Sequence, residues 1–132
     1  MKSYRNLLSI ALCVCFAAPA WAAGEIKEVL IRKKSPNVNI RVVIDNPGQT
    51  TQQGPLTITL YVRENAQASW EKIKTWNDIS RVKAGNEVAR DFFDENSARL
   101  TKLAQTPGFQ ARAVLDGPGV HAVERTAVFG NN

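Results

Sequence analysis

Hydrophobic and polar residues alternate one by one over long stretches of this chain. In residues 38–45, Val38, Ile40, Val42 and Ile44 alternate with Asn39, Arg41, Val43 and Asp45, and residues 56–63 repeat the pattern. Successive side chains of a strand point to opposite faces of a sheet, so this alternation predicts strands with one buried and one solvated face.

Five further segments also favour strands, and short runs of turn-forming residues separate them. These segments are residues 26–34, 70–76, 87–93, 109–116 and 120–129. The separators hold glycine, proline, asparagine and aspartate, as in residues 46–48, 54–55, 84–86, 106–108 and 116–119. No proline falls inside a predicted strand. Seven strands in about 105 residues predict a β-sandwich or a small barrel.

One segment departs from the alternation. Leu100 and Leu103 stand three residues apart among good helix formers. This spacing predicts one or two helical turns within residues 96–105.

The first 22 residues have the three parts of a secretory signal. Lys2 and Arg5 precede an apolar run over residues 7–18 that only Ser9 interrupts, and Ala20-Trp21-Ala22 provides a small-x-small cleavage site. The run holds about a dozen residues, whereas a spanning helix needs about 20. We therefore expect cleavage rather than a retained anchor. The remaining residues 23–132 would then form one periplasmic or secreted domain with no transmembrane segment.

Cysteine content and charge limit the chemistry of that domain. Both cysteines, Cys13 and Cys15, lie in the predicted signal, so the processed chain has no disulfide and no thiolate metal site. The signal also holds two of the 17 basic residues, and 15 basic minus 12 acidic side chains leaves a charge of +3. This charge is too small for the basic footprint of a nucleic-acid-binding domain.

The second half of the chain resembles the CARDB family, the cell adhesion related domain found in bacteria. The matching residues are 81–85 (RVKAG), 106–109 (TPGF), 111–116 (ARAVLD), 120–124 and the terminal pair Asn131-Asn132, and residues 39–46 resemble an earlier strand of the family. The resemblance implies an all-β, immunoglobulin-like β-sandwich of about seven antiparallel strands. It also implies a non-catalytic module that acts outside the cytoplasm.

The predicted strand over residues 70–76 carries the best candidate binding site. Trp70 and Trp76 are six residues apart and should share one face with Lys72 and Lys74. A wholly buried face would not hold two lysines, because an unpaired buried ammonium group is costly. An exposed tryptophan beside cations could bind a sugar, a peptidoglycan fragment or an acidic strand of a partner. The alternative places Trp76 in the core and Trp70 at its edge, with the lysine stems over apolar surface.

No catalytic constellation is present in the processed chain. His121 is the single histidine, and Ser69, Ser80 and Ser97 lack the context of a nucleophile elbow. A structural or surface histidine is therefore expected, and neither an enzyme nor a cofactor.

Two charged clusters have a functional and a structural interpretation. Asp91, Asp94 and Glu95 could hold Ca²⁺, but they lack the glycine and the regular carboxylate spacing of a calcium loop, which favours a solvated acidic loop and no metal. The basic run 32–34 could meet an anionic surface such as lipid phosphates. More often such a run prevents an edge strand from pairing with other chains.

Three hypotheses for function follow. The first is an exported, non-catalytic binding, adhesion or assembly module for an extracytoplasmic protein or glycan, with partner contacts at Trp70, Lys72, Lys74 and Trp76. The second is a structural subunit that assembles by edge-strand pairing, which would include homo-oligomers. The third, a small hydrolase or an enzyme inhibitor, requires titratable groups gathered around His121.

Overall fold

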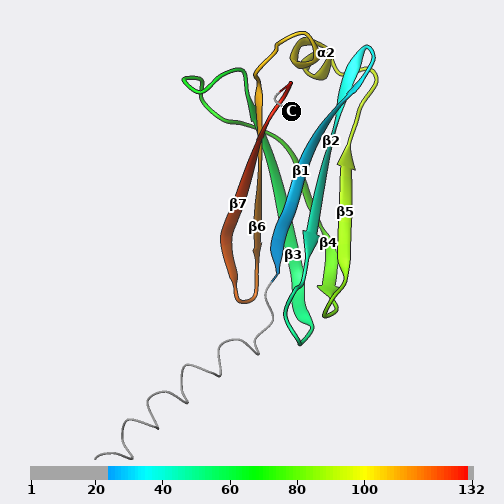
Figure 1. The fold of residues 1–132 in the computed structure, drawn as a ribbon, viewed down its shortest axis with the longest axis vertical. Coiled ribbons are helices and arrows are strands. Elements are labelled where there is room, and N and C mark those ends of the chain that lie inside the picture. Colours follow the sequence, from blue (N-terminus) through cyan, green and yellow to red (C-terminus); the bar gives the residue numbers. More distant parts are fainter. Residues whose placement is uncertain (1–23, 131–132) are drawn as a thin grey trace, which may run out of the picture.

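Residues 24–130 are described by the structure, a computed structural model, and they form two facing antiparallel sheets (Figure 1). One sheet has the order β1-β2-β5 and the other has the order β4-β3-β6-β7. The elements are β1 (Glu25–Lys34), β2 (Asn37–Asp45), β3 (Gln52–Arg63), β4 (Glu71–Val82), β5 (Glu87–Phe92), α2 (Ala98–Ala104), β6 (Gln110–Gly117) and β7 (Val120–Val128). The predicted signal, residues 1–22, lies outside the described residues.

The predicted fold class is confirmed. Each of the seven predicted strands overlaps one observed strand, and the predicted helical turns correspond to α2. The two sheets enclose the alternating apolar positions, as in an immunoglobulin-like sandwich. Within residues 24–130, no helix is long and apolar enough to span a membrane.

The core lies between the sheets and is filled from both of them. Fully or almost fully buried side chains include Val38, Ile40, Val42, Ile44, Leu56, Ile58, Leu60, Val62, Ala111, Ala113 and Leu115. Each buried Val, Leu or Ile contributes about 1.5–3 kcal/mol relative to an exposed position. This burial keeps the faces of β2, β3 and β6 fixed, so that the outward side chains have defined positions.

Helix α2 closes one end of the sandwich (Figure 1). It begins after Ser97, whose Oγ accepts a hydrogen bond from the Leu100 backbone N–H at 3.1 Å, and it buries Leu100 and Leu103. The buried Asn37 at the start of β2 holds the helix in place through two hydrogen bonds. Its Nδ2 donates to the Asp94 carbonyl at 2.7 Å, and its Oδ1 accepts from the Thr101 hydroxyl. These contacts position α2 over the gap between the two sheets.

The strand predicted over residues 56–63 begins earlier than expected and contains a proline. Strand β3 begins at Gln52 and therefore includes Pro55, which we had predicted to lie in a turn. The pairing of β3 with β4 shifts register between Gln53 and Leu56, and such an irregularity tolerates a residue without an N–H. Gly54 is needed there, since a Cβ at this position would lie 2.3 Å from the Ser80 carbonyl oxygen.

Candidate functional site

The structure separates the four residues of the predicted strip into two pairs. Trp76 lies opposite the buried Ile58, and it packs against the core while partly exposed. Lys74 is on the same side, with its Nζ 5.9 Å from the centre of the Trp76 ring. Trp70 and Lys72 instead belong to the outer face of the four-stranded sheet. The expectation of one shared face was therefore wrong.

A β-bulge at Ile73 is the physical reason for this separation. Leu60 of β3 is paired with Lys74 and its neighbour Tyr61 with Lys72, so that Ile73 has no partner in β3. One extra residue in a strand reverses the faces of all residues beyond it. Lys72 consequently lies opposite Tyr61, which points outward between the buried Leu60 and Val62.

Trp70 lies between two arginines on that outer face. The guanidinium carbon of Arg63 is 4.1 Å from the centre of the Trp70 ring, and that of Arg112 is 4.6 Å away. Arg112 also lies 5.1 Å from the centre of the Tyr61 ring. Together with Lys72, these residues form a surface that we call the Trp70 patch: Tyr61, Arg63, Trp70, Lys72 and Arg112.

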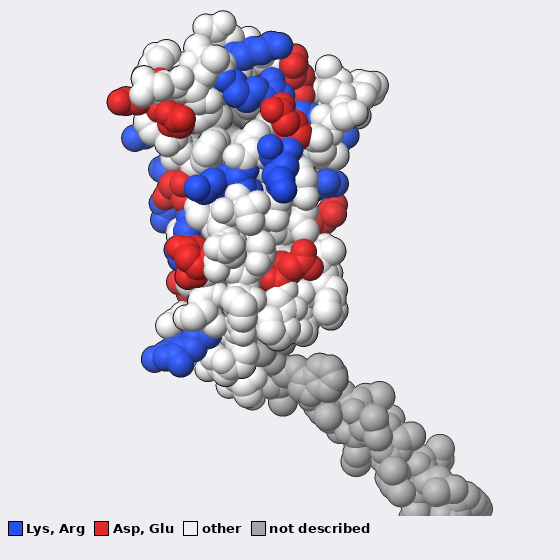
Figure 2. Space-filling model, turned by 180° about the vertical axis from the view of Figure 1, so that it is seen from behind, with Lys and Arg blue, Asp and Glu red and all other residues white. Residues whose placement is uncertain are grey.

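Strand pairing explains how residues far apart in the sequence form this patch. Tyr61 of β3 is directly opposite Arg112 of β6, and Arg63 is opposite Gln110. Arg112 points outward because it lies between the buried Ala111 and Ala113. Figure 2 shows basic and acidic side chains mixed over the upper half of one side of the molecule, with fewer charged side chains below them.

The basic side chains of the Trp70 patch have N–H groups that remain free to donate hydrogen bonds to a partner. Arg63 donates from Nε to the Gln110 Oε1 at 2.8 Å, and no carboxylate among the described residues forms an ion pair with Arg63 or Lys72. Arg112 is 3.9 Å from a Glu124 carboxylate oxygen, and its Nε is buried without a partner in residues 24–130. The patch is thus cationic, aromatic and only partly neutralised.

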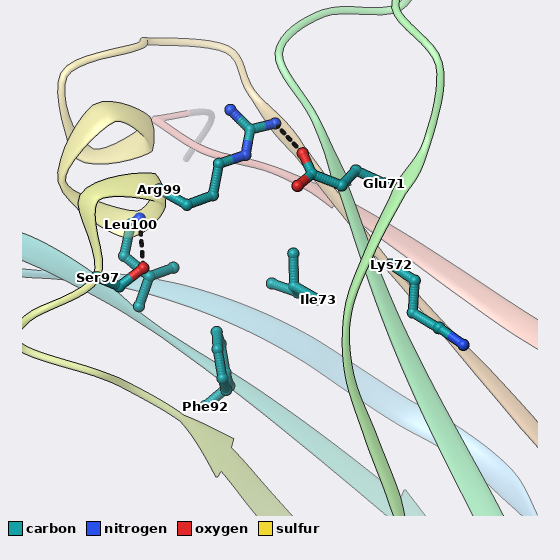
Figure 3. A pocket seen from close by; sticks show the side chains of 7 residues that line it. All are labelled: Glu71, Lys72, Ile73, Phe92, Ser97, Arg99 and Leu100. Atoms are coloured by element: carbon teal, nitrogen blue, oxygen red, sulfur yellow. Dashed lines mark hydrogen bonds and ion pairs between the residues drawn. The ribbon is translucent and has the colours of Figure 1, made fainter.

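A cavity of about 230 Å³ lies on another side of the fold, between β4, β5 and α2. Figure 3 shows Ile73, Phe92 and Leu100 directed toward it, while Lys72 points away. Its rim holds Glu71, Ser97 and Arg99. The apolar lining and the small size favour an aliphatic or aromatic group rather than a cofactor, since small-molecule pockets usually measure about 300–1,000 Å³.

Ion pairs hold the rim of the cavity in place. Arg99 of α2 contacts Glu71 at 2.8 Å and Glu64 at 3.5 Å, and Lys102 lies 3.3 Å from Glu64. The hydrogen bond and charge of Lys102, followed by those of Arg99, lower the pKa of the Glu64 carboxyl. These contacts join the helix to the segment that leads into β4.

The remaining candidate residues do not meet at a common site. His121 is exposed near the start of β7, and no group of three or more His, Cys, Asp or Glu side chains in residues 24–130 could hold a metal. Asp91 forms ion pairs with Arg41 at 3.0 Å and with Arg32 at 3.9 Å. The basic run 32–34 ends β1, which is an edge strand of its sheet.

Comparisons with known proteins support the fold. No family model matches the chain, and no curated protein sequence matches it. The solved structure of the archaellum periplasmic stator protein FlaG from Sulfolobus acidocaldarius is similar with a TM-score of 0.50 and 14% identity, over 81% of this chain and 100% of that one. The narrower CARDB assignment stays a prediction.

Two further solved structures are similar over parts of longer proteins. The sporulation control protein Spo0M from Bacillus subtilis has a TM-score of 0.47 and 12% identity, with 81% of this chain and 48% of that one covered. A cycloisomaltooligosaccharide glucanotransferase from Paenibacillus sp. has a TM-score of 0.49 and 18% identity, with 83% of this chain and 14% of that one covered. The likeness to FlaG, at a TM-score of 0.50 and 14% identity, concerns the fold alone.

Proposed function

We propose that this chain is an exported, non-catalytic binding module whose protein or glycan partner contacts the Trp70 patch. The observation that carries the proposal is the stack of Trp70 with the guanidinium groups of Arg63 and Arg112 on an outer sheet face. Trp, Tyr and Arg are the residue types that most often dominate binding energy at protein interfaces. Here they gather on one face.

The stack favours binding because it orders the arginines in advance. A free arginine loses side-chain entropy when it binds, and that loss reduces affinity. Arg63 is already held by the Trp70 ring and by Gln110, and Arg112 lies against both rings. Their remaining N–H groups suit carboxylate or phosphate oxygens, which accept paired hydrogen bonds from guanidinium groups. An anionic partner therefore fits the patch best.

Export and the absence of catalysis are supported by the sequence. The signal-like residues 1–22 favour a periplasmic or secreted location, and the sequence after them has no cysteine and no nucleophile-elbow motif. The CARDB resemblance adds a cell-adhesion module as the finer hypothesis. FlaG, a protein of similar fold, is named as a periplasmic stator protein, but that likeness concerns the fold. The proposal rests on the patch.

Site-specific photocrosslinking in the producing cells tests the proposal. A photoreactive phenylalanine analogue at Tyr61 should give a crosslinked partner that is lost when Trp70→Ala and Arg112→Ala are introduced. The same analogue at Leu30 is the matched control, because Leu30 is exposed on the opposite sheet. Equal products from both positions, or none from Tyr61, would contradict the proposal. Circular dichroism checks that each variant folds.

A further inference from the structure

The two sheets leave a seam open along one side of the sandwich. Strands β4 and β5 are edge strands of different sheets, and the ion pair between Asp78 of β4 and Arg90 of β5, at 3.3 Å, joins them across this seam. Farther along, the cavity of about 230 Å³ lies between these two strands and α2 (Figure 3). Its rim is accessible to solvent, because Glu71 and Lys72 are exposed there.

The walls of the cavity are apolar. Leu100 of α2 is fully buried, and Ile73 and Phe92 pack against the core while partly exposed. An apolar cavity of about 150 Å³ lined by Leu, Ile and Phe holds one benzene molecule. A volume of about 230 Å³ thus has room for one aromatic ring and about three more heavy atoms. A ring is favoured over an aliphatic group, because it can also pair with the Phe92 ring.

The charged side chains at the rim are paired with one another. Arg99 contacts Glu71 at 2.8 Å and Glu64 at 3.5 Å, and Lys102 lies 3.3 Å from Glu64. Lys72 lines the cavity but points away from it (Figure 3). An ionised ligand would therefore lose its hydration without gaining an unpaired counter-charge, which is costly. A neutral ligand is favoured.

One hydrogen-bond donor beside the cavity has no acceptor. The Nε of Arg99 is buried without a partner in residues 24–130, although both terminal nitrogens of the same guanidinium group contact carboxylates. Figure 3 shows the Arg99 side chain extending from α2 toward Glu71 beside the cavity that it lines. A buried N–H without an acceptor costs free energy. An uncharged oxygen of a ligand would provide the acceptor.

We propose that the cavity binds a small neutral aromatic molecule that carries one carbonyl oxygen. The ring packs against the three apolar side chains, and the oxygen accepts a hydrogen bond from Arg99 Nε. The ion pairs with Glu64 and Glu71 hold the guanidinium group in place, so this donor is ordered before the ligand binds. The inference does not depend on the partner proposed for the Trp70 patch.

Two-dimensional NMR of the isotope-labelled protein tests the inference with acetophenone as the probe. We expect saturable shifts of the amide signals of residues 71–73, 92 and 97–100 and of the Arg99 Nε–H signal. For a ligand of about nine heavy atoms, a Kd of about 1 mM or tighter is expected. Benzoate should bind more weakly, because its carboxylate would be unpaired in the cavity. A capped phenylalanine amide, which represents a side chain of a partner protein, should also bind more weakly.

Filling the cavity tests where the ring binds. Ile73→Phe should weaken acetophenone binding by about tenfold or more, the loss expected when an apolar group is no longer buried. Val128→Phe adds the same ring at an exposed position of β7 and should leave the affinity unchanged. Circular dichroism checks that each variant folds.

A second variant tests the hydrogen bond. Arg99→Lys keeps a cation beside Glu71 but removes Nε. The affinity for acetophenone relative to isopropylbenzene, which has a methyl group in place of the oxygen, should therefore fall about tenfold. Lys102→Ala is the matched control, because it removes another cation from Glu64 and should leave this ratio unchanged.

Four results would overturn the inference. They are no saturable shift at millimolar acetophenone, unchanged affinity in Ile73→Phe, an unchanged ratio in Arg99→Lys, and tighter binding of benzoate or of the phenylalanine amide than of acetophenone. The last result would assign the cavity to an anion or to a side chain of a partner instead. Arg112→Ala should not alter the affinity for acetophenone. That variant separates the cavity from the Trp70 patch, so either proposal can fail alone.

Discussion

Replacing Trp70 by alanine removes the shared centre of the Trp70 patch. A cation–π contact contributes about 0.5–1 kcal/mol at an exposed site and about 2 kcal/mol when desolvated. The Arg112 side chain is 24% exposed, and two guanidinium groups contact the ring within 5 Å. We therefore expect Trp70→Ala to lower the free energy of unfolding by about 1–2 kcal/mol. For a domain of this size that corresponds to a fall in Tm of about 4–16 °C.

A double-mutant cycle isolates the contact between the ring and an arginine. The free energy of unfolding is measured by urea titration with circular dichroism for Trp70→Ala, Arg112→Ala and the double variant. A coupling energy of about 0.5–1 kcal/mol is expected, because each single variant already removes the contact. Arg81 is the matched control, since it is an exposed arginine of β4 with no ring contact in the described part of the chain.

The reasoning fails if Trp70 couples to Arg112 no more strongly than to Arg81. The ring would then be held by apolar contact alone, and the arginines would not be ordered in advance of binding. A coupling near zero would therefore remove the main support for the proposed partner site, even if Trp70→Ala itself destabilised the fold.

Three further variants test the fold around the sites. Gly54→Ala places a Cβ 2.3 Å from the Ser80 carbonyl oxygen, and a backbone neighbour cannot rotate away. The free energy of unfolding, measured by urea titration, should therefore fall by about 3 kcal/mol. Wild-type stability would refute the close approach of β3 and β4. Phe109→Ala removes a fully buried ring that packs 5.0 Å from Phe129 and should cost about 3–5 kcal/mol, so a loss below about 1 kcal/mol contradicts the packing. The hydrogen bond and charge of Arg90 lower the pKa of Asp78, so this ion pair should stabilise the fold above about pH 4, with the contribution lost as pH falls through the folded pKa. Asp78→Asn should thus reduce Tm at pH 7 and have a smaller effect at pH 2; the same reduction at both pH values would exclude the ion pair as the cause.

Alternation predicted most of the fold because each face of these strands has one environment. In β3 every second residue from Leu56 to Val62 is buried, as predicted. Strand β2 buries Ile40 and Val42 in the same way but also buries Asn39 and Val43 on its other face, because it is the central strand of its sheet.

Most predicted strand ends lie within a few positions of the observed ones. Strand β4 is the exception, because it continues six residues past the predicted end at Trp76, to Val82. The predicted helical turns also formed, since Leu100 and Leu103 face the core on one side of α2.

The sequence alone could not identify the two arginines that contact Trp70, although its alternation does place both of them on polar strand faces. Alternation assigns Arg63 and Arg112 to polar faces, but nothing in the spacing shows that β3 and β6 are neighbours. That pairing places Tyr61 opposite Arg112, which lies 51 positions later in the chain (112 − 61), and it depends on the order of strands within the sheet. The cavity was missed for the same reason, because three separate elements line it.

The bulge at Ile73 accounts for both candidate surfaces at once. Without this unpaired residue, Trp70 and Lys72 would share the face of Lys74 and Trp76, and the buried side of an edge strand would carry two lysines. The extra residue turns Trp70 and Lys72 outward to the arginines, while Ile73 itself lies against the core and lines the cavity. The alternation of apolar and polar residues does not reveal the extra residue of a bulge, because a bulged segment has the same kinds of residue as a regular strand. A bulged edge strand is also a poor template for pairing, which leaves β5 as the regular free edge on this side of the sandwich.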